Sequence, residues 1–278
     1  MPGSIARVLR VPAWRPERGA YEDRVAVEEP LEIRIDGVPV AVTLRTPGED
    51  EELAAGFALT EGLARGPAGV ARVERVDDGP PESRGNVVDV VLAGAPAATE
   101  EAGAPRRTGR PAFITAACGV CGRGTLDAVR RRAEPLPDGP LVARAILASL
   151  PARLRPAQAG FDETGGLHAA GLFDLEGNAL AVREDIGRHN AVDKIVGWAV
   201  LGGRLPLSRG LLAVSGRAGF EIVLKAWIAG IPVVASVSAP SHLAVAMAEE
   251  ANLTLAGFVR DGSFAVYAGR ERVAPAAG

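Results

Sequence analysis

The chain is poor in residue types that often carry chemistry or charge. Its 278 residues include two cysteines and three histidines, and aromatic residues make up 4%. Only Lys194 and Lys225 are lysines, so almost every positive charge is an arginine. Short arginine clusters such as 130–132 therefore say little about a binding site, and we interpret that cluster as a solvated helix face.

Long apolar runs and an excess of one charge are also absent. No stretch approaches the roughly 20 apolar residues of a membrane-spanning helix, and the arginine-bearing first 18 residues lack the apolar segment of a signal peptide. The formal net charge is −3, which argues against wholesale binding to nucleic acid or membrane surfaces. We expect a cytoplasmic protein, in whose reducing environment a structural disulfide is disfavoured.

What remains is enough for a real core. An apolar content of 47% over this length supports one large or two modest domains. Residues 1–24 lack sustained periodicity and are interpreted as a flexible arm. Residues 25–110 are predicted to form a small α+β domain that ends in the Ala/Gly/Pro-rich connector 93–110. Residues 111–278 are predicted to form the second domain.

Local patterns predict the elements of both domains. Alternating apolar residues on either side of Asp36-Gly37 predict a β-hairpin, and a helix and a strand follow. In the second domain, strands and helices alternate toward the C-terminus, which predicts a parallel sheet with right-handed crossovers. The further predicted elements are a helix after Gly48, a strand from Val87 to Leu92, helices over 126–133 and 141–150, antiparallel strands over 164–173 and 179–184, and a helix with Asn190 as its N-cap.

Both cysteines lie in one glycine-rich loop. Cys118 and Cys121 are separated by two residues and are accompanied by Gly119, Gly122 and Gly124. Such a pair can form a disulfide, hold half of a zinc site or present one reactive sulfur beside a helper, and the spacing does not choose among these. The glycines favour a mobile loop that can present a sulfur at the surface.

Three loops are expected to meet at one edge of the predicted sheet. Ligands of such sheets gather beyond the carboxyl ends of the strands. The loops 215–219, 238–242 and 259–263 would lie there, and they are rich in hydrogen-bond donors and small residues. That composition suits the close approach of a phosphate or a base edge.

All three histidines fall in turns or at strand ends, so at least two are expected to line one pocket. They are His168, His189 and His242. A catalytic zinc is not expected. A zinc deaminase places His-x-Glu ahead of its Cys-x-x-Cys, whereas here His168 is followed by two alanines and the cysteine pair comes first.

Taken together, these motifs resemble the FdhD/NarQ family of formate dehydrogenase accessory sulfurtransferases. The match extends from about Val25 to Tyr267, and the stretch from Thr46 to Gly62 is similar as well. His242 is a departure from the family pattern. The motifs are Cys118-Gly-Val-Cys121-Gly, Gly165-Gly-Leu-His168-Ala-Ala, Glu184-Asp-Ile-Gly-Arg-His189-Asn-Ala-Val-Asp-Lys194, Ser215-Gly-Arg217 and Gly230-Ile-Pro-Val-Val-Ala-Ser-Val-Ser-Ala-Pro240-Ser.

The resemblance implies a sulfur carrier. A cysteine desulfurase would load a persulfide, with Cys118 carrying it and Cys121 assisting. The terminal sulfur would pass to the molybdenum or tungsten of a bis(molybdopterin guanine dinucleotide) cofactor before its insertion into the formate dehydrogenase catalytic subunit. The implied fold class is α/β. A C-terminal deaminase-like domain with three α/β/α layers, without the deaminase's zinc, would lie beside a smaller α+β domain. The resemblance also implies a homodimer.

The cofactor's nucleotide ends are expected at the sheet edge. Arg217 would bind a phosphate, His189 would add a donor, and the segment from Phe258 to Ser263 would offer an apolar face, a guanidinium and a carboxylate to guanine. The alternatives are that Arg217 pairs with Asp185 or Glu221, and that the segment is an exposed turn. The expected cofactor-binding residues are His189, Ser215, Gly216, Arg217, Phe258, Val259, Arg260, Asp261, Gly262 and Ser263.

Two other functional classes stay open. A dithiol redox enzyme would use Cys118 and Cys121 reversibly, although thioredoxin-like proteins place that pair at a strand-to-helix turn near the chain start. A non-catalytic chaperone that binds a nucleotide or cofactor would keep the pocket at the sheet edge and leave the cysteines without a role. Alkylation of the thiols separates these classes, because only a pure binder keeps its activity.

Overall fold

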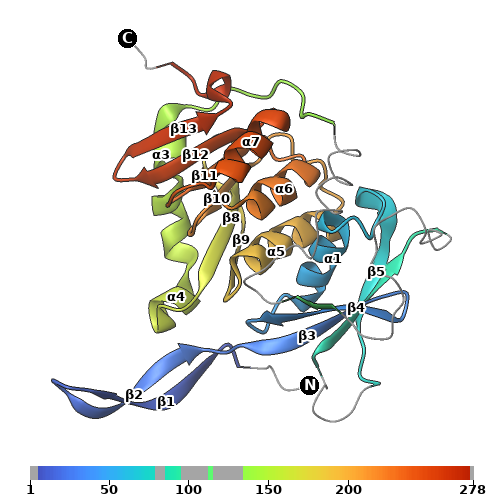
Figure 1. The fold of residues 1–278 in the computed structure, drawn as a ribbon, viewed down its shortest axis with the longest axis vertical. Helices are drawn as coiled ribbons and strands as arrows, with labels where there is room; N and C mark the ends of the chain where they lie inside the picture. Colours follow the sequence, from blue (N-terminus) through green and yellow to red (C-terminus); the bar gives the residue numbers. More distant parts are fainter. Residues whose placement is uncertain (1–5, 79–84, 95–111, 115–133, 276–278) are drawn as a thin grey trace.

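The computed structural model describes residues 6–78, 85–94, 112–114 and 134–275, with the backbone alone for 112–114. The predicted cysteine loop lies outside the described residues. So do most of the connector and the helix predicted over 126–133. Within the described part, the chain forms a large sheet, a smaller sheet and a separate two-stranded hairpin (Figure 1).

The large sheet has six strands in the order β13-β12-β11-β10-β8-β9. The strands β10, β11 and β12 are parallel, as predicted, and antiparallel partners flank them on both sides. The sheet is therefore mixed. Its strands are β8 (His168–Phe173), β9 (Ala179–Asp185), β10 (Leu211–Val214), β11 (Val233–Ser236), β12 (Thr254–Arg260) and β13 (Ser263–Ala268).

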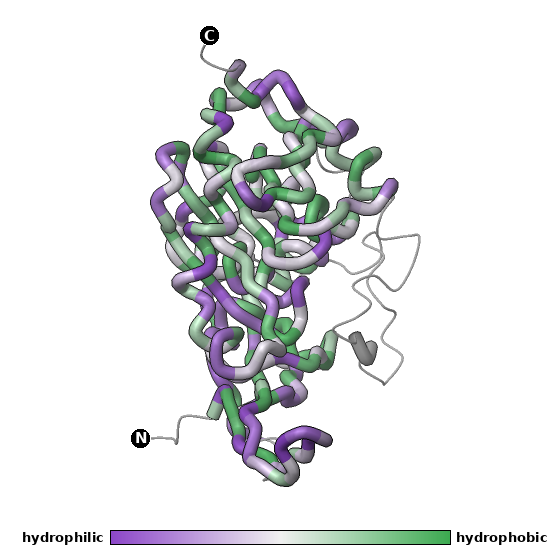
Figure 2. Tube along the Cα trace, turned by 90° about the vertical axis from the view of Figure 1, so that its left-hand side faces the viewer, coloured by the Kyte–Doolittle hydropathy of each residue, from purple (hydrophilic) through white to green (hydrophobic). Residues whose placement is uncertain are grey.

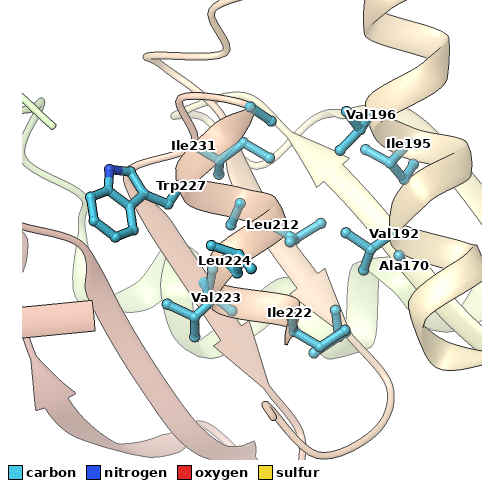
Figure 3. Packing of buried hydrophobic residues seen from close by; sticks show 14 of the residues in the cluster. Ala170, Val192, Ile195, Val196, Leu212, Ile222, Val223, Leu224, Trp227 and Ile231 are labelled. Carbon is cyan, nitrogen blue, oxygen red and sulfur yellow. The ribbon is translucent and has the colours of Figure 1, made fainter. Parts of the chain in front are cut away.

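Helices cover both faces of this sheet. One face packs against α5 (Arg188–Leu201), α6 (Phe220–Ile228) and α7 (His242–Glu250), and Figure 3 shows residues of α5, α6 and the sheet meeting there. The other face packs against α3 (Arg144–Leu154). Alternate residues of β10 enter the two cores, so all four of its residues are buried. The three-layer α/β/α arrangement and the α/β class are confirmed.

The smaller sheet carries the predicted hairpin. Its five strands lie in the order β5-β6-β3-β4-β7. Asp36 and Gly37 both have positive φ, 49° and 78°, as a tight two-residue hairpin turn requires. The predicted strand from Val87 to Leu92 is confirmed as β6. The elements are β3 (Glu29–Ile35), β4 (Val38–Arg45), α1 (Asp50–Thr60), β5 (Val70–Arg75), β6 (Val87–Leu92) and β7 (Ala112–Ile114).

The first described residues form a hairpin that the sequence did not indicate. The strands β1 (Val8–Arg15) and β2 (Gly19–Ala26) pair antiparallel. Figure 2 shows hydrophilic residues interspersed with hydrophobic ones along this hairpin. Because charged residues stand on both of its faces, the apolar-polar alternation that reveals a half-buried strand is missing. An ion pair of 3.3 Å between Arg24 and Glu163 links the hairpin to α4 (Ala159–Thr164).

Helix α3 also differs from its prediction, because it continues through Pro151 instead of ending before it. Leu150 and Leu154 on either side of the proline are buried in the core beneath the sheet, which anchors the last turn. The proline removes one hydrogen bond but stands close to the helix end, where few bonds depend on it. Short 3-10 turns occupy Pro67–Gly69, Arg155–Ala157 and Arg270–Arg272. None of the described helices has the length and apolar character to cross a membrane.

Helix α1 packs against α5 at backbone contact. A Cβ added at Gly56 would lie 1.9 Å from the Asp193 carbonyl oxygen, and one added at Gly197 would lie 1.7 Å from the Glu52 carbonyl oxygen. No side chain fits at either position. Helix α1, which follows the β3–β4 hairpin of the small sheet, therefore packs directly against α5, which covers one face of the large sheet (Figure 1).

We expect Gly197→Ala to destabilise the protein by about 3 kcal/mol or more, because its methyl group must force α1 and α5 apart. Urea unfolding followed by circular dichroism measures this change. The matched control is Gly166→Ala, whose Cβ would meet its nearest atom at 3.7 Å and which should change stability by less than about 0.5 kcal/mol. Equal stability of the two variants would contradict the close helix contact.

Candidate functional site

One edge of the large sheet collects the predicted site residues. Strands β10, β11 and β12 end at this edge, and helices α6 and α7 begin beyond it. Because β8 and β9 are antiparallel partners, the start of β8 and the end of β9 reach the same edge, where His168 stands opposite Asp185. Helix α5 then begins two residues after β9.

Hydrogen bonds join the three loops that were expected to meet here. The Ser236 hydroxyl lies 2.7 Å from the Gly216 carbonyl oxygen and 3.0 Å from that of Ser238. The Phe258 N–H donates to the same Ser238 carbonyl at 3.1 Å. The Ser241 N–H donates to the Ala218 carbonyl at 3.0 Å. The first two loops therefore bind each other and Phe258, which directly precedes the third loop, and together they form one connected rim around the ends of β10, β11 and β12.

Two of the histidines lie within this edge. His168 is half-buried, and its Nδ1 would be 3.2 Å from a Cβ at Gly216, so the glycine allows the imidazole to approach the loop. His189 stands in the first turn of α5 and is 5% exposed. His242 is exposed in the first turn of α7. Ser215 fixes the start of β8, since its hydroxyl accepts from the Ala169 N–H at 2.9 Å.

Burial keeps His189 neutral. Removal from water, together with the positive charges of Arg188 and Lys225, lowers its pKa to about 3. Burial also lowers the pKa of His168, with Arg188 acting in the same direction and Asp185 against it. The His189 Nε2 has no hydrogen-bond partner among the described residues. The Glu221 Oε2 lies 3.7 Å from this nitrogen.

Arg217 is exposed at the end of β10. It forms no ion pair with any residue that the structure describes, so neither acidic partner considered from the sequence holds it. Asp185 instead pairs with Lys194 at 2.9 Å, and Glu221 lies beside His189. The guanidinium is thus available to a ligand at this edge.

The segment from Phe258 to Ser263 forms the end of the β12–β13 hairpin. Arg260, Asp261 and Gly262 are exposed, and Asp261 and Gly262 have the positive φ of a tight turn. The exposed-turn conformation considered from the sequence is therefore present. Phe258 is 41% exposed and adopts φ 52°, an unusual backbone for a bulky residue. The β-bulge here turns an aromatic ring toward solvent.

Comparison with known proteins explains why these motifs occur together. The model of the FdhD/NarQ family matches residues 26–274.

The chain belongs to the FdhD/NarQ family.

Curated members of the family are similar over most of their length. The sulfur carrier protein FdhD of Nocardia farcinica is 50% identical over 272 residues, which cover 96% of this chain and 93% of the relative. That of Streptomyces coelicolor is 50% identical over 260 residues, 91% of this chain and 89% of the relative. That of Mycolicibacterium paratuberculosis is 48% identical over 261 residues, 91% and 93% of the two chains.

The fold also has a solved counterpart. The crystal structure of a protein assigned as a formate dehydrogenase accessory protein, from Desulfotalea psychrophila, superimposes with a TM-score of 0.72. It is 23% identical in sequence, and the match covers 96% of this chain and 98% of the other. At this identity the likeness establishes the fold.

In this member of the family, the motif from Glu184 to Lys194 is largely structural. Lys194 and Asp185 are both 0% exposed in their side chains and lie 2.9 Å apart. Asp185 also accepts from the Thr46 N–H and from the Asn190 side-chain amide. Gly187 occupies the N-cap position of α5, so the prediction of Asn190 as N-cap is wrong. Asn190 instead donates to the Leu44 carbonyl and ties β4 to the helix.

A second buried ion pair involves Asp193, the residue before Lys194 on α5. Lys225 donates to Asp193 at 2.9 Å and to the Thr60 hydroxyl at 2.9 Å, and it pairs with Glu61 at 3.3 Å. Burial raises the pKa of Asp193 to about 6, while the Lys225 charge pulls it down. Lys225 thus binds the C-terminal end of α1. Lys194 lies 3.7 Å from Glu49 at the N-terminal end, so the two lysines hold both ends of the helix.

The sequence analysis did not identify Glu221 as a neighbour of His189. It was considered only as a partner for Arg217, yet it is the one acidic residue of the apolar helix α6 and follows the glycine of the Ser215–Gly219 loop by two positions. An isolated acid at the start of an otherwise apolar helix was the available signal.

A cavity of about 380 Å³ lies away from this site. It borders the amino end of β11, the edge opposite to the loops. None of the predicted site residues lines it. The lining residues are Leu136, Pro137, Asp138, Gly139, Pro140, Ser208, Arg209, Gly230 and Pro232.

The depressed pKa of His189 predicts a pH dependence of stability. The unfolded chain gains a proton on His189 as the pH falls below 6.5, whereas the folded protein does so only near its pKa of about 3. The stability that His189 contributes should therefore be fully present above pH 6.5 and fall toward about pH 5, by up to about 1.4 kcal/mol per pH unit.

Urea unfolding at several pH values tests this dependence, with His189→Gln as the variant that cannot titrate. Asp193 opposes the trend in the same window but is present in both proteins, so the difference between their slopes isolates the imidazole. Identical slopes for the two proteins would show that His189 is not held neutral by the fold.

Proposed function

We propose that this protein is a cytoplasmic sulfur carrier that accepts persulfide sulfur from a cysteine desulfurase. It delivers the sulfur to the molybdenum or tungsten of a bis(molybdopterin guanine dinucleotide) cofactor destined for formate dehydrogenase. Membership of the FdhD/NarQ family and relatives named as sulfur carriers support the general role. The observation that carries the proposal is the rim of three loops at the sheet edge with the exposed Arg217, which forms no ion pair with a described residue.

The chain leads from this edge toward the cysteines. Strand β7 runs parallel to β4, with Ile114 opposite Thr43. The Thr43 hydroxyl lies 3.4 Å from the side-chain oxygen of Asn190, the residue after His189. Cys118 and Cys121 lie outside the described residues. Because Cys118 follows Ile114 by four positions, the chain can carry it at most about 14 Å from the end of β7.

The proposed chemistry has two transfers. In the first, the Cys118 thiolate attacks the terminal sulfur of the desulfurase persulfide, and the desulfurase thiolate leaves. In the second, the bond between the two sulfur atoms would break, Cys118 would return to a thiolate, and the terminal sulfur would bind the reduced cofactor metal, whose two electrons convert the sulfane sulfur to a sulfido ligand. A persulfide moves a sulfur atom without releasing it to solution, and Cys121 would assist as the neighbouring thiol.

The cofactor enters this scheme as cargo. Arg217 and the backbone N–H groups of the loop from Ser215 to Gly219 would bind its phosphates. Phe258 offers a planar face for a ring, and Arg260 and Asp261 extend the rim on the β12 side. A homodimer and contact with the formate dehydrogenase catalytic subunit complete the proposal.

The sulfur-carrying role is tested by intact-mass spectrometry after incubation with a cysteine desulfurase and cysteine. We expect a mass increase of one sulfur that is absent from Cys118→Ala and retained by Cys121→Ala, because Cys118 carries the persulfide. Loss in the Cys121 variant alone would reverse the assignment. An unchanged mass in the unaltered protein would refute the carrier role and leave a redox enzyme or a binding chaperone.

The nucleotide pocket is tested by isothermal titration with GDP and ADP. GDP should bind more tightly than ADP, and Arg217→Ala should weaken GDP binding by about 1.5–3 kcal/mol, the usual contribution of a hydrogen bond to a charged group. The matched control is Arg209→Ala, an exposed arginine beside the cavity at the opposite edge. Equal affinities for the two nucleotides, or no effect of Arg217→Ala, would remove the guanine pocket from the proposal.

A further inference from the structure

The cavity of about 380 Å³ lies at the edge of the large sheet opposite to the rim of loops, and three segments of the chain build it. They are the loop 136–140 before α3, residues 208–209 before β10 and the turn 230–232 before β11. Leucine and proline side chains supply its apolar walls, and a carboxylate, a hydroxyl and a guanidinium supply its polar groups. Apolar walls with a few polar groups, at a volume of this order, are typical of sites for small molecules.

Two opposite charges line this cavity without pairing with each other. They belong to Asp138 and Arg209, and no ion pair joins them. Within the part of the chain that the structure describes, Arg209 and the hydroxyl of Ser208 have no hydrogen-bond partner. The Asp138 carboxylate accepts one hydrogen bond, from the Asn252 side-chain amide at 3.3 Å. Separate, unpaired charges of opposite sign complement a ligand that carries both charges itself.

A buried network holds the acidic wall of the cavity in place. The Asn252 amide that binds Asp138 also donates to a backbone carbonyl of the loop 136–140 at 2.9 Å. Arg272 is 3% exposed and donates to the Pro137 carbonyl at 2.9 Å and to the Asn252 side-chain oxygen at 3.4 Å. Because this loop is fixed before a ligand arrives, binding costs little conformational entropy.

The same arginine adds positive charge behind the cavity wall. The Arg272 Nε would lie 2.8 Å from a Cβ at Gly139, which lines the cavity, and it has no partner among the described residues. The nearby Glu271 carboxylate, 3.7 Å from the Arg272 Nη1, is 66% exposed and offsets this charge weakly. A simple amine would therefore meet two guanidinium groups, whereas a simple carboxylate would leave Asp138 without a partner.

We propose that this cavity binds the zwitterion of an α-amino acid with an apolar side chain. The ligand's carboxylate accepts from the Arg209 guanidinium and the Ser208 hydroxyl, and its ammonium group donates to Asp138. The ligand's side chain packs against Leu136 and the prolines of the wall. The site lies at the opposite edge of the sheet from the rim of loops, so it is distinct from the proposed nucleotide pocket and does not depend on it.

Titration calorimetry on the full chain tests the site with L-leucine and L-phenylalanine. Each is compared with its analogue that lacks the ammonium group, isocaproate or hydrocinnamate, and with its analogue that lacks the carboxylate, isoamylamine or phenethylamine. We expect at least one of the amino acids to bind roughly ten- to hundredfold more tightly than both of its analogues, because each analogue loses hydrogen bonds to a charged group. Arg209→Gln should abolish the advantage over the amine, and Asp138→Asn the advantage over the carboxylate.

The matched control is Arg65→Gln, which changes an exposed arginine that follows α1 and should leave both advantages intact. The comparison of analogues in the unaltered protein does not depend on how the variants fold. Failure of both amino acids to bind, an analogue that binds as tightly as its parent, or advantages that survive in both variants would each overturn the inference. Binding of GDP to the same sample reports on the proposed function separately, so a protein that binds GDP but neither amino acid contradicts this inference alone.

Discussion

The backbone contact between α1 and α5 is the constraint on which the rest of the structure depends. Gly56 and Gly197 bring the two helices so close that the carbonyl groups of one fill the space of the missing side chains of the other. The buried pairs Lys194–Asp185 and Lys225–Asp193 then hold the ends of the contact. Removing one member of such a pair leaves an uncompensated buried charge, at a cost of about 3–5 kcal/mol.

The same ion pairs shape the candidate site. Lys225 joins α6 to α5 and α1, and its charge helps to keep His189 neutral. His189 in turn faces Glu221 from the neighbouring helix. The three helices α1, α5 and α6 therefore share one electrostatic environment at the sheet edge. A mutation in either buried ion pair would change the electrostatics of the site although neither pair contacts a ligand. Unfolding measurements therefore have to accompany binding measurements, so that a loss of stability is not taken for a loss of a ligand contact.

Much of the fold could be predicted from local patterns. The Asp36-Gly37 hairpin, the helix after Gly48 and the alternation from β10 to β12 follow from turn chemistry and apolar periodicity, and the structure contains all of them. The β1–β2 hairpin could not be predicted, because its strands bury no continuous apolar face. The convergence of the three loops followed from parallel topology, whereas the pairing of Glu221 with His189 joins two helices whose relative placement no local pattern encodes.

The sequence by itself determined the family, the glycine-rich loop with both cysteines and the edge of the sheet at which ligand-binding loops gather. Those conclusions depend on residue order, which folding does not change. The tertiary structure decided what the polar residues of the longest motif do. Asp185, Asn190 and Lys194 belong to the motif that also carries His189, and their side chains bind partners in β4 and in the loop before α1, more than 130 positions away. Hydrogen-bonding groups look alike in a sequence, and only burial against a particular neighbour determines which are satisfied and which, like the His189 Nε2, have no partner in the part of the chain that the structure describes.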